Sequence, residues 1–309
     1  MFKKFKTEFF FIAKLFGNKY PLKYYFSYFK NKLWGDYYLS KLRPVRCLAG
    51  NDLEIHVLCQ KKDLEMLEWN IRSFVYYSGL CPRVVVHDDG SIDAKAADLI
   101  ESRISNLRIL FKSEADKIIN NSKDLTDKVR EFRNKGHIMI MEFFDLYFFG
   151  YLSDAKNIMI LDSDVLFLNK PQEIVDFVNG KNSCDAMISR QYGTYDLKIN
   201  ESYAKILDTE KKETGYMNPG LIIYKNGSLS LKSFVEYFDH TERNIQDYFL
   251  GMAGWGCLVS QTKFDFLPGD KYKIKWQPNE NTVMKHFTSP RRHEFYAYGI
   301  DMIKSKIKN

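Results

Sequence analysis

Apolar runs of strand length alternate with amphipathic segments of helix length from about residue 51 onward. Short apolar runs predict strands at 53–59, 83–87, 107–111 and 156–161. Helical spacing predicts helices at 64–77, 94–104 and 126–152, the last with a break at Gly136. This alternation predicts an α/β fold in which helices cover both faces of a mostly parallel sheet.

The second half of the chain shows a weaker form of the same pattern. An extended run at 165–168 precedes a short helix at 171–178, and a strand is expected at 186–189. The sequence MNPG at 217–220 predicts a turn that leads into a strand at 221–224. A helix is expected at 230–240, and loops beyond residue 270 lead to a last helix at 298–308.

Composition and charge set the start of the chain apart, so we divide it into residues 1–50 and one domain of residues 51–309. Residues 1–50 contain eleven Lys and Arg and two acids, a net charge of +9, whereas the whole chain carries +7. The same residues include many aromatics, and apolar side chains recur at helical spacing at Phe2, Phe5, Phe9, Ile12 and Phe16. A basic aromatic helical segment is typical of proteins that bind an anionic membrane surface. The alternative is a helix that packs its aromatic face on the rest of the protein.

Other features of the sequence bear on the cellular location of the protein. No apolar run approaches the ~20 residues that span a bilayer, and the run at 9–13 is too short for a secretion signal. The five cysteines form no CxxC pair, so we expect reduced, mostly buried thiols. These features predict a cytoplasmic protein that is peripheral on the cytoplasmic face of a membrane. No nucleic-acid-binding motif accompanies the basic residues, so a nucleic-acid partner is not expected.

The sharpest chemical feature is a pair of carboxylates, Asp162 and Asp164, directly after the predicted strand at 156–161. Burying a carboxylate costs free energy unless it is paired or binds a metal. Mg²⁺ and Mn²⁺ accept carboxylate oxygens and usually keep positions for substrate phosphates. In an open parallel sheet, ligands bind beyond the carboxyl ends of the strands. The pattern therefore indicates a metal site for a phosphate-containing ligand.

Two weaker motifs accompany this pair. Asp88 and Asp89 follow the predicted strand at 83–87 and precede a glycine, which allows a tight turn beside a ligand. Near the end of the chain His286 precedes Arg291 and Arg292, a combination that can join a metal ligand with phosphate-binding groups. Taken singly, each motif is equally typical of a surface loop without a ligand.

Together and in this order, the three motifs resemble the GT-A fold nucleotide-sugar glycosyltransferases, whose DxD motif matches the carboxylate pair. The resemblance implies a GT-A sheet with a Rossmann-like nucleotide-binding half. It implies that Asp164 binds Mn²⁺ or Mg²⁺, that Asp162 contacts the metal or the ribose, and that His286 completes the metal site. It also implies that Asp88 and Asp89 hold the nucleoside.

The late histidine is most similar to that of the glycogenin-like and galactosyltransferase-like group, which is retaining. That group has a phosphate-binding lysine after the histidine, whereas this chain has Arg291 and Arg292 and lacks the usual glycine. Arginine can also bind phosphate. Asn218 and Gly220 resemble a turn that lies against the donor sugar in that group.

Three further residues lie where GT-A enzymes often place acceptor-side groups: Gln246, Asp247 and Trp255. Asp247 is the candidate catalytic residue, because a carboxylate there can bind a sugar hydroxyl or act as a base. Trp255 can stack on a sugar face, and Gln246 is a candidate sugar contact. The alternatives are a core tryptophan and a surface aspartate.

The resemblance implies metal-dependent transfer of a sugar from a nucleoside-diphosphate sugar, with a UDP-sugar favoured, to a glycan, polysaccharide or glycolipid acceptor. A haloacid-dehalogenase-like phosphatase also places DxD after a strand, but Leu166 stands where that family has Thr or Val. A sugar-phosphate nucleotidyltransferase would open with a glycine-rich loop, which residues 58–62 lack. A catalytically inactive GT-A scaffold protein is the non-enzymatic alternative.

Overall fold

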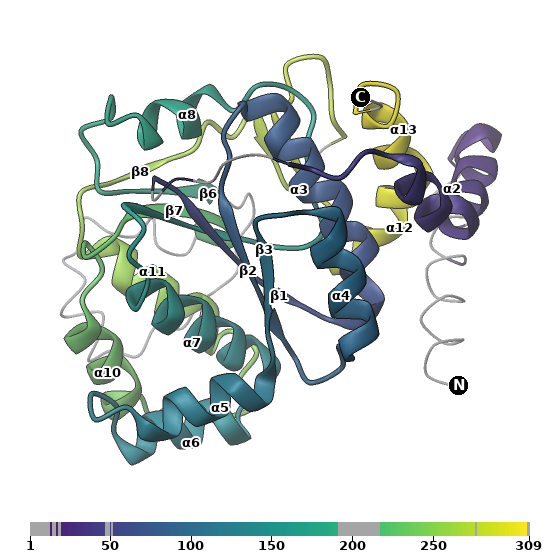
Figure 1. Cartoon of the computed structure of the whole chain (residues 1–309). Coiled ribbons are helices and arrows are strands. Elements are labelled where there is room, and N and C mark those ends of the chain that lie inside the picture. The colour runs from purple at the N-terminus through teal and green to yellow at the C-terminus, as the bar shows by residue number, and fades with distance from the viewer. Residues whose placement is uncertain are drawn as a thin grey trace.

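The computed structural model describes residues 20–46, 50, 52–190, 217–275 and 277–307, together with residues 13 and 17. Its centre is a seven-stranded sheet in the order β3-β2-β1-β4-β7-β6-β8 (Figure 1). The strands are β1 (Glu54–Cys59), β2 (Arg83–Asp88), β3 (Leu107–Leu110), β4 (Asn157–Leu161), β6 (Ala186–Arg190), β7 (Met217–Lys225) and β8 (Phe264–Phe266). Four of the six pairings are parallel, and only the two made by β7 are antiparallel.

Helices cover both faces of this sheet (Figure 1). The helices on or beside the sheet are α3 (Leu64–Ser78), α4 (Ala94–Arg103), α5 (Lys112–Asn121), α6 (Asp127–Lys135), α7 (Ile138–Tyr151), α8 (Gln172–Val178), α10 (Leu231–His240) and α11 (Leu250–Ser260). Alternate residues of β4 face opposite cores: Ile158 and Ile160 pack with α7 and α11, and Met159 and Leu161 pack with α3. The sheet is therefore buried on both sides, as its near-continuous apolar strands require.

A smaller sheet, in the order β5-β10-β9, lies beside the carboxyl end of β4. Its strands are β5 (Val165–Phe167), β9 (Tyr272–Lys273) and β10 (Met284–His286). The chain then continues through η3 (Ser289–Arg291), α12 (Arg292–Glu294), η4 (Phe295–Gly299) and α13 (Ile300–Ile303). These last elements form a third apolar cluster with α3 and with the N-terminal helix α2 (Leu22–Lys41).

Most of the predicted elements are confirmed. The long helical region does break at Gly136: α6 ends at Lys135 and α7 begins at Ile138. A side chain at position 136 would meet the Phe132 carbonyl oxygen at 2.2 Å, so glycine lets the two helices meet there. The central sheet is mostly parallel, with helices on both sides, as the α/β alternation predicts.

The turn predicted at 217–220 is wrong, because these residues already belong to β7. The pairing with β6 shifts register between Ile188 and Ser189, so β7 carries an irregularity where Pro219 and Gly220 lie. A proline lacks the N–H that a regular ladder needs, and such residues concentrate at bulges.

Helices α5 and α11 went unpredicted for different reasons. α5 is amphipathic but short, and only Ala115 and Ile119 are buried. α11 contains three glycines, which disfavour a helix by about 1 kcal/mol each. Tertiary packing overrides this preference: a side chain at position 251 would meet the Met139 carbonyl oxygen at 2.2 Å, and one at 254 would meet the Phe143 ring at 2.3 Å.

The remaining predictions have mixed outcomes. Cys59, Cys184 and Cys257 are free and buried, but Cys81 is disulfide-bonded, so the expectation of reduced thiols throughout is wrong. The apolar positions from Phe2 to Phe16 lie outside the described residues, and the division at residue 50 stays a prediction. Among the described helices, none combines the length and apolarity needed to cross a bilayer.

Candidate functional site

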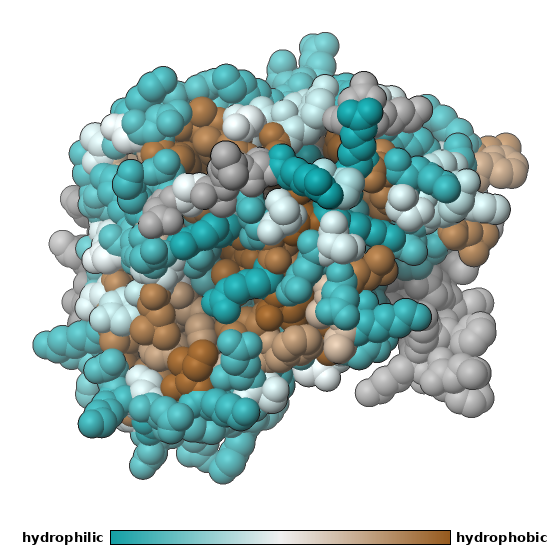
Figure 2. Space-filling view, viewed as in Figure 1, coloured by the Kyte–Doolittle hydropathy of each residue, from teal (hydrophilic) through white to brown (hydrophobic). Residues whose placement is uncertain are grey.

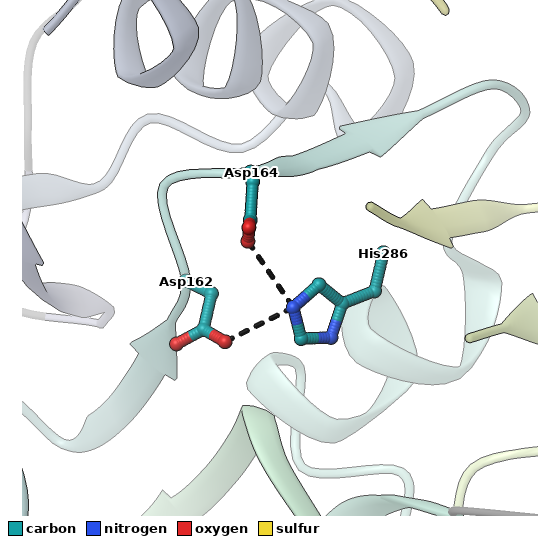
Figure 3. Close-up of side chains that lie close together, drawn as sticks. All are labelled: Asp162, Asp164 and His286. Carbon is teal, nitrogen blue, oxygen red and sulfur yellow. Dashed lines mark ion pairs between the residues drawn. The ribbon is translucent and has the colours of Figure 1, made fainter. Parts of the chain in front are cut away.

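The candidate site is built where β4 ends and the small sheet begins. Asp162 follows β4, and Asp164 immediately precedes β5. β10 runs antiparallel to β5 and places His286 opposite Val165. The Nε2 atom of His286 lies 3.0 Å from Oδ2 of Asp162 and 3.1 Å from Oδ1 of Asp164 (Figure 3). Two carboxylates and one imidazole thus converge although more than 120 residues separate them along the chain.

Helix α3 and the small sheet hold the acidic turn in place. The side-chain amide of Asn70 donates to the backbone oxygen of Asp162 at 2.7 Å. The hydroxyl of Ser73 accepts from the backbone N–H of Phe167 at 3.0 Å. The Phe287 N–H donates to the backbone oxygen of Asp164 at 2.9 Å. These bonds fix the backbone on both sides of the turn, so both carboxylates face the His286 ring.

Gly220 provides the space that the histidine ring occupies. Its carbonyl accepts from the Asp162 N–H at 3.0 Å, and its own N–H donates to the Asn218 side chain at 3.0 Å. A Cβ at this position would meet Cε1 of His286 at 2.3 Å and Oδ2 of Asp162 at 2.8 Å. The irregularity in β7 therefore brings a residue without a side chain against the site.

Strong electrostatic coupling marks these groups. Burial alone would raise the pKa of Asp164, but the charges of Arg292 and His286 hold it well below its ordinary value. Burial alone would lower the pKa of His286, but the carboxylates of Asp164 and Asp162 raise it to about 9. The two carboxylates therefore favour a positive charge at the position of the imidazole, which is a position suited to a cation.

The two arginines after His286 differ in their surroundings. Arg292 donates from Nε to Oδ2 of Asp164 at 2.7 Å and from a terminal nitrogen to Asp63 at 3.0 Å. It therefore orients the carboxylate that contacts His286. Arg291 is half-buried, and its guanidinium forms no ion pair with any residue that the structure describes.

The donor set fits a divalent metal ion. One ligand atom from each of Asp162, Asp164 and His286 lies within 4.8 Å of the others. Within the described ranges, no other group of three His, Cys, Asp or Glu side chains meets this condition. Nδ1 of His286 is buried without a hydrogen-bond partner. Carboxylate oxygens with one imidazole suit Mg²⁺ or Mn²⁺.

Asp88 and Asp89 lie at the same sheet edge. Asp88 ends β2 and pairs in register with Cys59, the last residue of β1. Its carboxylate is buried and accepts from the N–H groups of Gly90 at 2.8 Å and Ile92 at 2.9 Å, so it shapes the loop. Asp89 is half-buried, and one of its oxygens accepts from the Ser91 N–H at 3.1 Å.

The three acceptor-side candidates have structural partners. Asp247 pairs with Arg243 at 3.1 Å and accepts from the Phe249 N–H at 2.8 Å. The Gln246 amide donates to the Lys135 carbonyl at 2.6 Å. Their functional roles stay predictions.

Trp255 requires a correction. Only 2% of its surface is exposed, and its ring packs against Phe143 with centroids 5.1 Å apart. An indole enclosed in the core has no free face on which a sugar could stack. Trp255 is therefore a core residue, and we do not propose a sugar-stacking role for it.

Sequence reasoning missed Glu142 on α7. Burial and the neighbouring Asp162 carboxylate raise its pKa well above the ordinary value, and it shares a hydrogen bond with Asp162. The signal was present, because Glu142 and Asp145 are the only charged residues in the apolar helix α7. A charge in an apolar segment needs a partner. Asp145 has one in Arg133, whose guanidinium binds both its oxygens.

Comparisons with known proteins agree with this fold. Two solved structures align over most of the chain: the galactosyltransferase LgtC in complex with donor and acceptor sugar analogs, and the bifunctional glycosyltransferase WbbM. LgtC is 12% identical, with a TM-score of 0.51, covering 80% of this chain and 95% of LgtC. WbbM is 11% identical, with a TM-score of 0.51, covering 86% of this chain and 53% of WbbM. At these identities the likeness shows the GT-A fold alone.

The search of curated proteins found no match. The model of glycosyl transferase family 8, in contrast, matches residues 85–267, which include most of β2, the acidic turn and β7. Because this match covers more than half of the sequence, the chain belongs to glycosyl transferase family 8 and is a glycosyltransferase.

Proposed function

We propose that this glycosyltransferase moves a sugar from a nucleoside-diphosphate sugar, with a UDP-sugar favoured, to a hydroxyl of a glycan or lipid-linked acceptor. The observation that carries the proposal is the convergence of Asp162, Asp164 and His286 beside Gly220 at the carboxyl edge of the sheet. This is the edge at which open α/β sheets bind ligands. Family membership also excludes the phosphatase and nucleotidyltransferase alternatives.

The three ligand residues would hold Mn²⁺ or Mg²⁺. Such an ion, when bound, would neutralise the charge that develops on the departing diphosphate. Arg292 would keep Asp164 oriented, since it donates to the oxygen that does not face His286. Asn70 would hold the backbone of the acidic turn while the substrate binds. The pre-set geometry would lower the cost of reorganisation during transfer.

Other residues would position the donor. Asp88 would keep the loop after β2 in shape, and Asp89 would accept hydrogen bonds from the nucleoside. Arg291, whose guanidinium forms no ion pair with any described residue, would contact the diphosphate. Asn218 and Gly220 would lie against the donor sugar, since both flank the candidate metal site in β7.

The acceptor is proposed to be part of a polysaccharide or glycolipid assembled at a membrane. The net charge of +9 in residues 1–50 supports association with an anionic membrane surface. A peripheral position would bring the enzyme close to lipid-linked acceptors.

The test is release of nucleoside diphosphate from a panel of UDP-, GDP- and other activated sugars, with Mn²⁺, with Mg²⁺ and with chelator. We expect one donor to be hydrolysed slowly without acceptor, only with metal, and Asp164→Asn to lower this rate about 100- to 1,000-fold. The matched control is Asp154→Asn, whose side chain is 70% exposed and follows α7 at the opposite edge of the sheet. Absence of turnover and of donor binding at every metal concentration would favour the inactive scaffold instead.

A further inference from the structure

Helix α2 has two faces of different character. Its inner face buries Tyr28, Asn31, Gly35 and Leu39. The Asn31 amide donates to the Tyr296 carbonyl in η4 at 2.8 Å, and Gly35 lies against the side chain of a glutamate in α3. This face anchors the helix to the body of the protein in a defined orientation.

The outer face carries a row of exposed apolar side chains. Of the thirteen large apolar residues that are exposed in the described parts of the chain, six lie on α2: Leu22, Phe26, Phe29, Leu33, Trp34 and Tyr37. The other seven are distributed over several elements. Leu22, Phe26 and Leu33 are each at least 75% exposed. Apolar side chains stand out along the edge of the molecule where α2 lies (Figure 2).

These residues form one continuous stripe. Five of them recur at intervals of four, three, four and four residues, which keeps them on one side of a helix with 3.6 residues per turn. Exposed apolar residues that gather in this way mark an interaction surface, whereas scattered ones need no explanation.

A basic row runs beside the apolar stripe. The row consists of three exposed lysines, Lys23, Lys30 and Lys41. By helical geometry they lie about 60–80° around the helix axis from the centre of the apolar stripe. None of the three forms an ion pair with a residue that the structure describes. The one acidic residue of α2, Asp36, is paired with Arg103 at 2.8 Å. The charge beside the stripe is therefore positive and uncompensated.

We propose that the outer face of α2 is the membrane-docking surface of this enzyme, with the apolar stripe inserted among the headgroups of an anionic bilayer and the lysines at its phosphates. An apolar stripe with lysines along its side is the arrangement of helices that lie in the interfacial plane. Pairing with a second copy through the same face would bring two rows of lysines together, which like-charge repulsion opposes. This assignment deepens the membrane association proposed above and rests on it.

Docking through α2 also couples the bilayer to the donor site. The inner face of α2 packs on η4, and α12, which directly precedes η4, begins with Arg292, the partner of Asp164. The helix that would touch lipid and the arginine that orients a metal ligand thus belong to one packed unit. Such an arrangement suits an acceptor whose lipid part stays in the membrane.

The experiment is co-sedimentation of the full chain with vesicles of phosphatidylcholine alone and with phosphatidylglycerol added. We expect binding only to the anionic vesicles and a marked loss at high salt. Replacing Phe26 and Leu33 together by Ser should weaken this binding at least tenfold, because each buried side chain contributes substantially. Leu99→Ser, on the exposed side of α4 where the residue is 46% exposed, is the matched control and should bind like the wild type.

A set of charge variants separates the electrostatic contribution to vesicle binding from the apolar contribution. Changing Lys23, Lys30 and Lys41 to Gln should lower binding about 100-fold, since each lysine near an anionic surface contributes about fivefold. The same charge change at three exposed lysines elsewhere should have a much smaller effect; these are Lys95, Lys117 and Lys123.

Two results would overturn the assignment. One is unchanged vesicle binding by the Phe26 and Leu33 double variant. The other is dimerisation in light scattering that the double variant abolishes, without any vesicle binding, which would make this face a contact between copies. Donor hydrolysis in solution is measured in parallel and should be the same in wild type and variants. Intact hydrolysis alongside either of these results would show that only the docking assignment has failed, whereas vesicle binding without donor hydrolysis would show that only the proposed function has failed.

Discussion

Two buried clusters in this protein pair histidine with carboxylate, and they behave in opposite ways. The edge cluster consists of Asp162, Asp164 and His286 at the carboxyl ends of the strands. The core cluster lies within the sheet: Glu54 contacts Nε2 of His56 at 3.0 Å, and Nδ1 of His56 contacts Nε2 of His87 at 2.9 Å. In the edge cluster the ligand atoms converge on one point, whereas in the core cluster the side chains contact one another in a line.

The groups that face each buried histidine determine the direction in which its pKa shifts. Two carboxylates facing one nitrogen raise the pKa of His286 to about 9 despite its burial. His87 is equally buried but faces another histidine, so burial and the neighbouring His56 lower its pKa well below the ordinary value. Burial alone would raise the pKa of Glu54, but its hydrogen bond to His56 and the charge of Arg83 lower it to about 2. Burial of a histidine therefore does not reveal its role, because the partners determine whether it is a cation site or a structural link.

The largest expected effect comes from removing the histidine of the edge cluster. His286→Ala should lower donor turnover about 100- to 1,000-fold and abolish stimulation by Mn²⁺, because an electrostatic stabiliser of the leaving group is lost. Turnover against metal concentration is the measurement, with His240→Ala, an exposed histidine of α10, as control. Full metal stimulation in His286→Ala would show that the edge cluster has a structural role, as the core cluster does.

The next effect is on stability and belongs to the core cluster. His56→Ala should lower the free energy of unfolding by about 2–3 kcal/mol, because it leaves buried polar atoms of two neighbours without a partner. Urea denaturation measures this loss. Turnover per folded molecule should stay unchanged, and a metal-dependent loss of turnover would show that the core cluster also serves the reaction.

A smaller effect is expected from the residue that makes room for the imidazole. Gly220→Ala places a Cβ 2.3 Å from the His286 ring, which must move away from the carboxylates. Metal affinity should fall about 10- to 100-fold, as for other residues that orient ligands. Calorimetric titration with Mn²⁺ checks this, and Gly50→Ala, where the added atom meets nothing closer than 3.6 Å, should bind as the wild type does.

The smallest expected effect, taken per pH unit, is the pH dependence of the free energy of unfolding in chelator. The raised pKa of His286 contributes stability that is complete below the ordinary value of 6.5 and is lost as pH rises through about 9. The free energy of unfolding of the wild type should therefore fall over this window, by at most about 1.4 kcal/mol for each pH unit. His286→Gln should remove that slope in pH-dependent urea denaturation, and an identical slope in the variant would refute the assignment.

The core cluster adds a dependence of the opposite sign. His87 stays neutral in the fold, so acidification below 6.5 favours the unfolded chain, which binds the proton more readily. The low pKa of Glu54 contributes stability present above 4.5 and lost as pH falls toward about 2.

Local patterns were informative wherever the evidence lay within a few residues. The strand that ends in Asp162 and Asp164 could be recognised because its apolar run and its carboxylates are adjacent. Asp88 could be placed at the same edge because parallel strands align their carboxyl ends, and its register opposite Cys59 confirms that placement. The place of Trp255 in α11 could not be predicted, since a tryptophan among glycines suits both a sugar contact and a core side chain until the packing of α7 against it is known.

By itself the sequence determined the α/β alternation, the acidic turn at the end of a buried strand and the basic character of the first 50 residues. Tertiary structure decided that His286 lies between the two carboxylates, that Gly220 leaves room for its ring and that α2 turns an apolar stripe outward. The physical reason is separation along the chain. Strand and turn propensities act over a few residues, whereas the site depends on pairing β10 with β5 and β7 with β4, and no local pattern specifies those contacts.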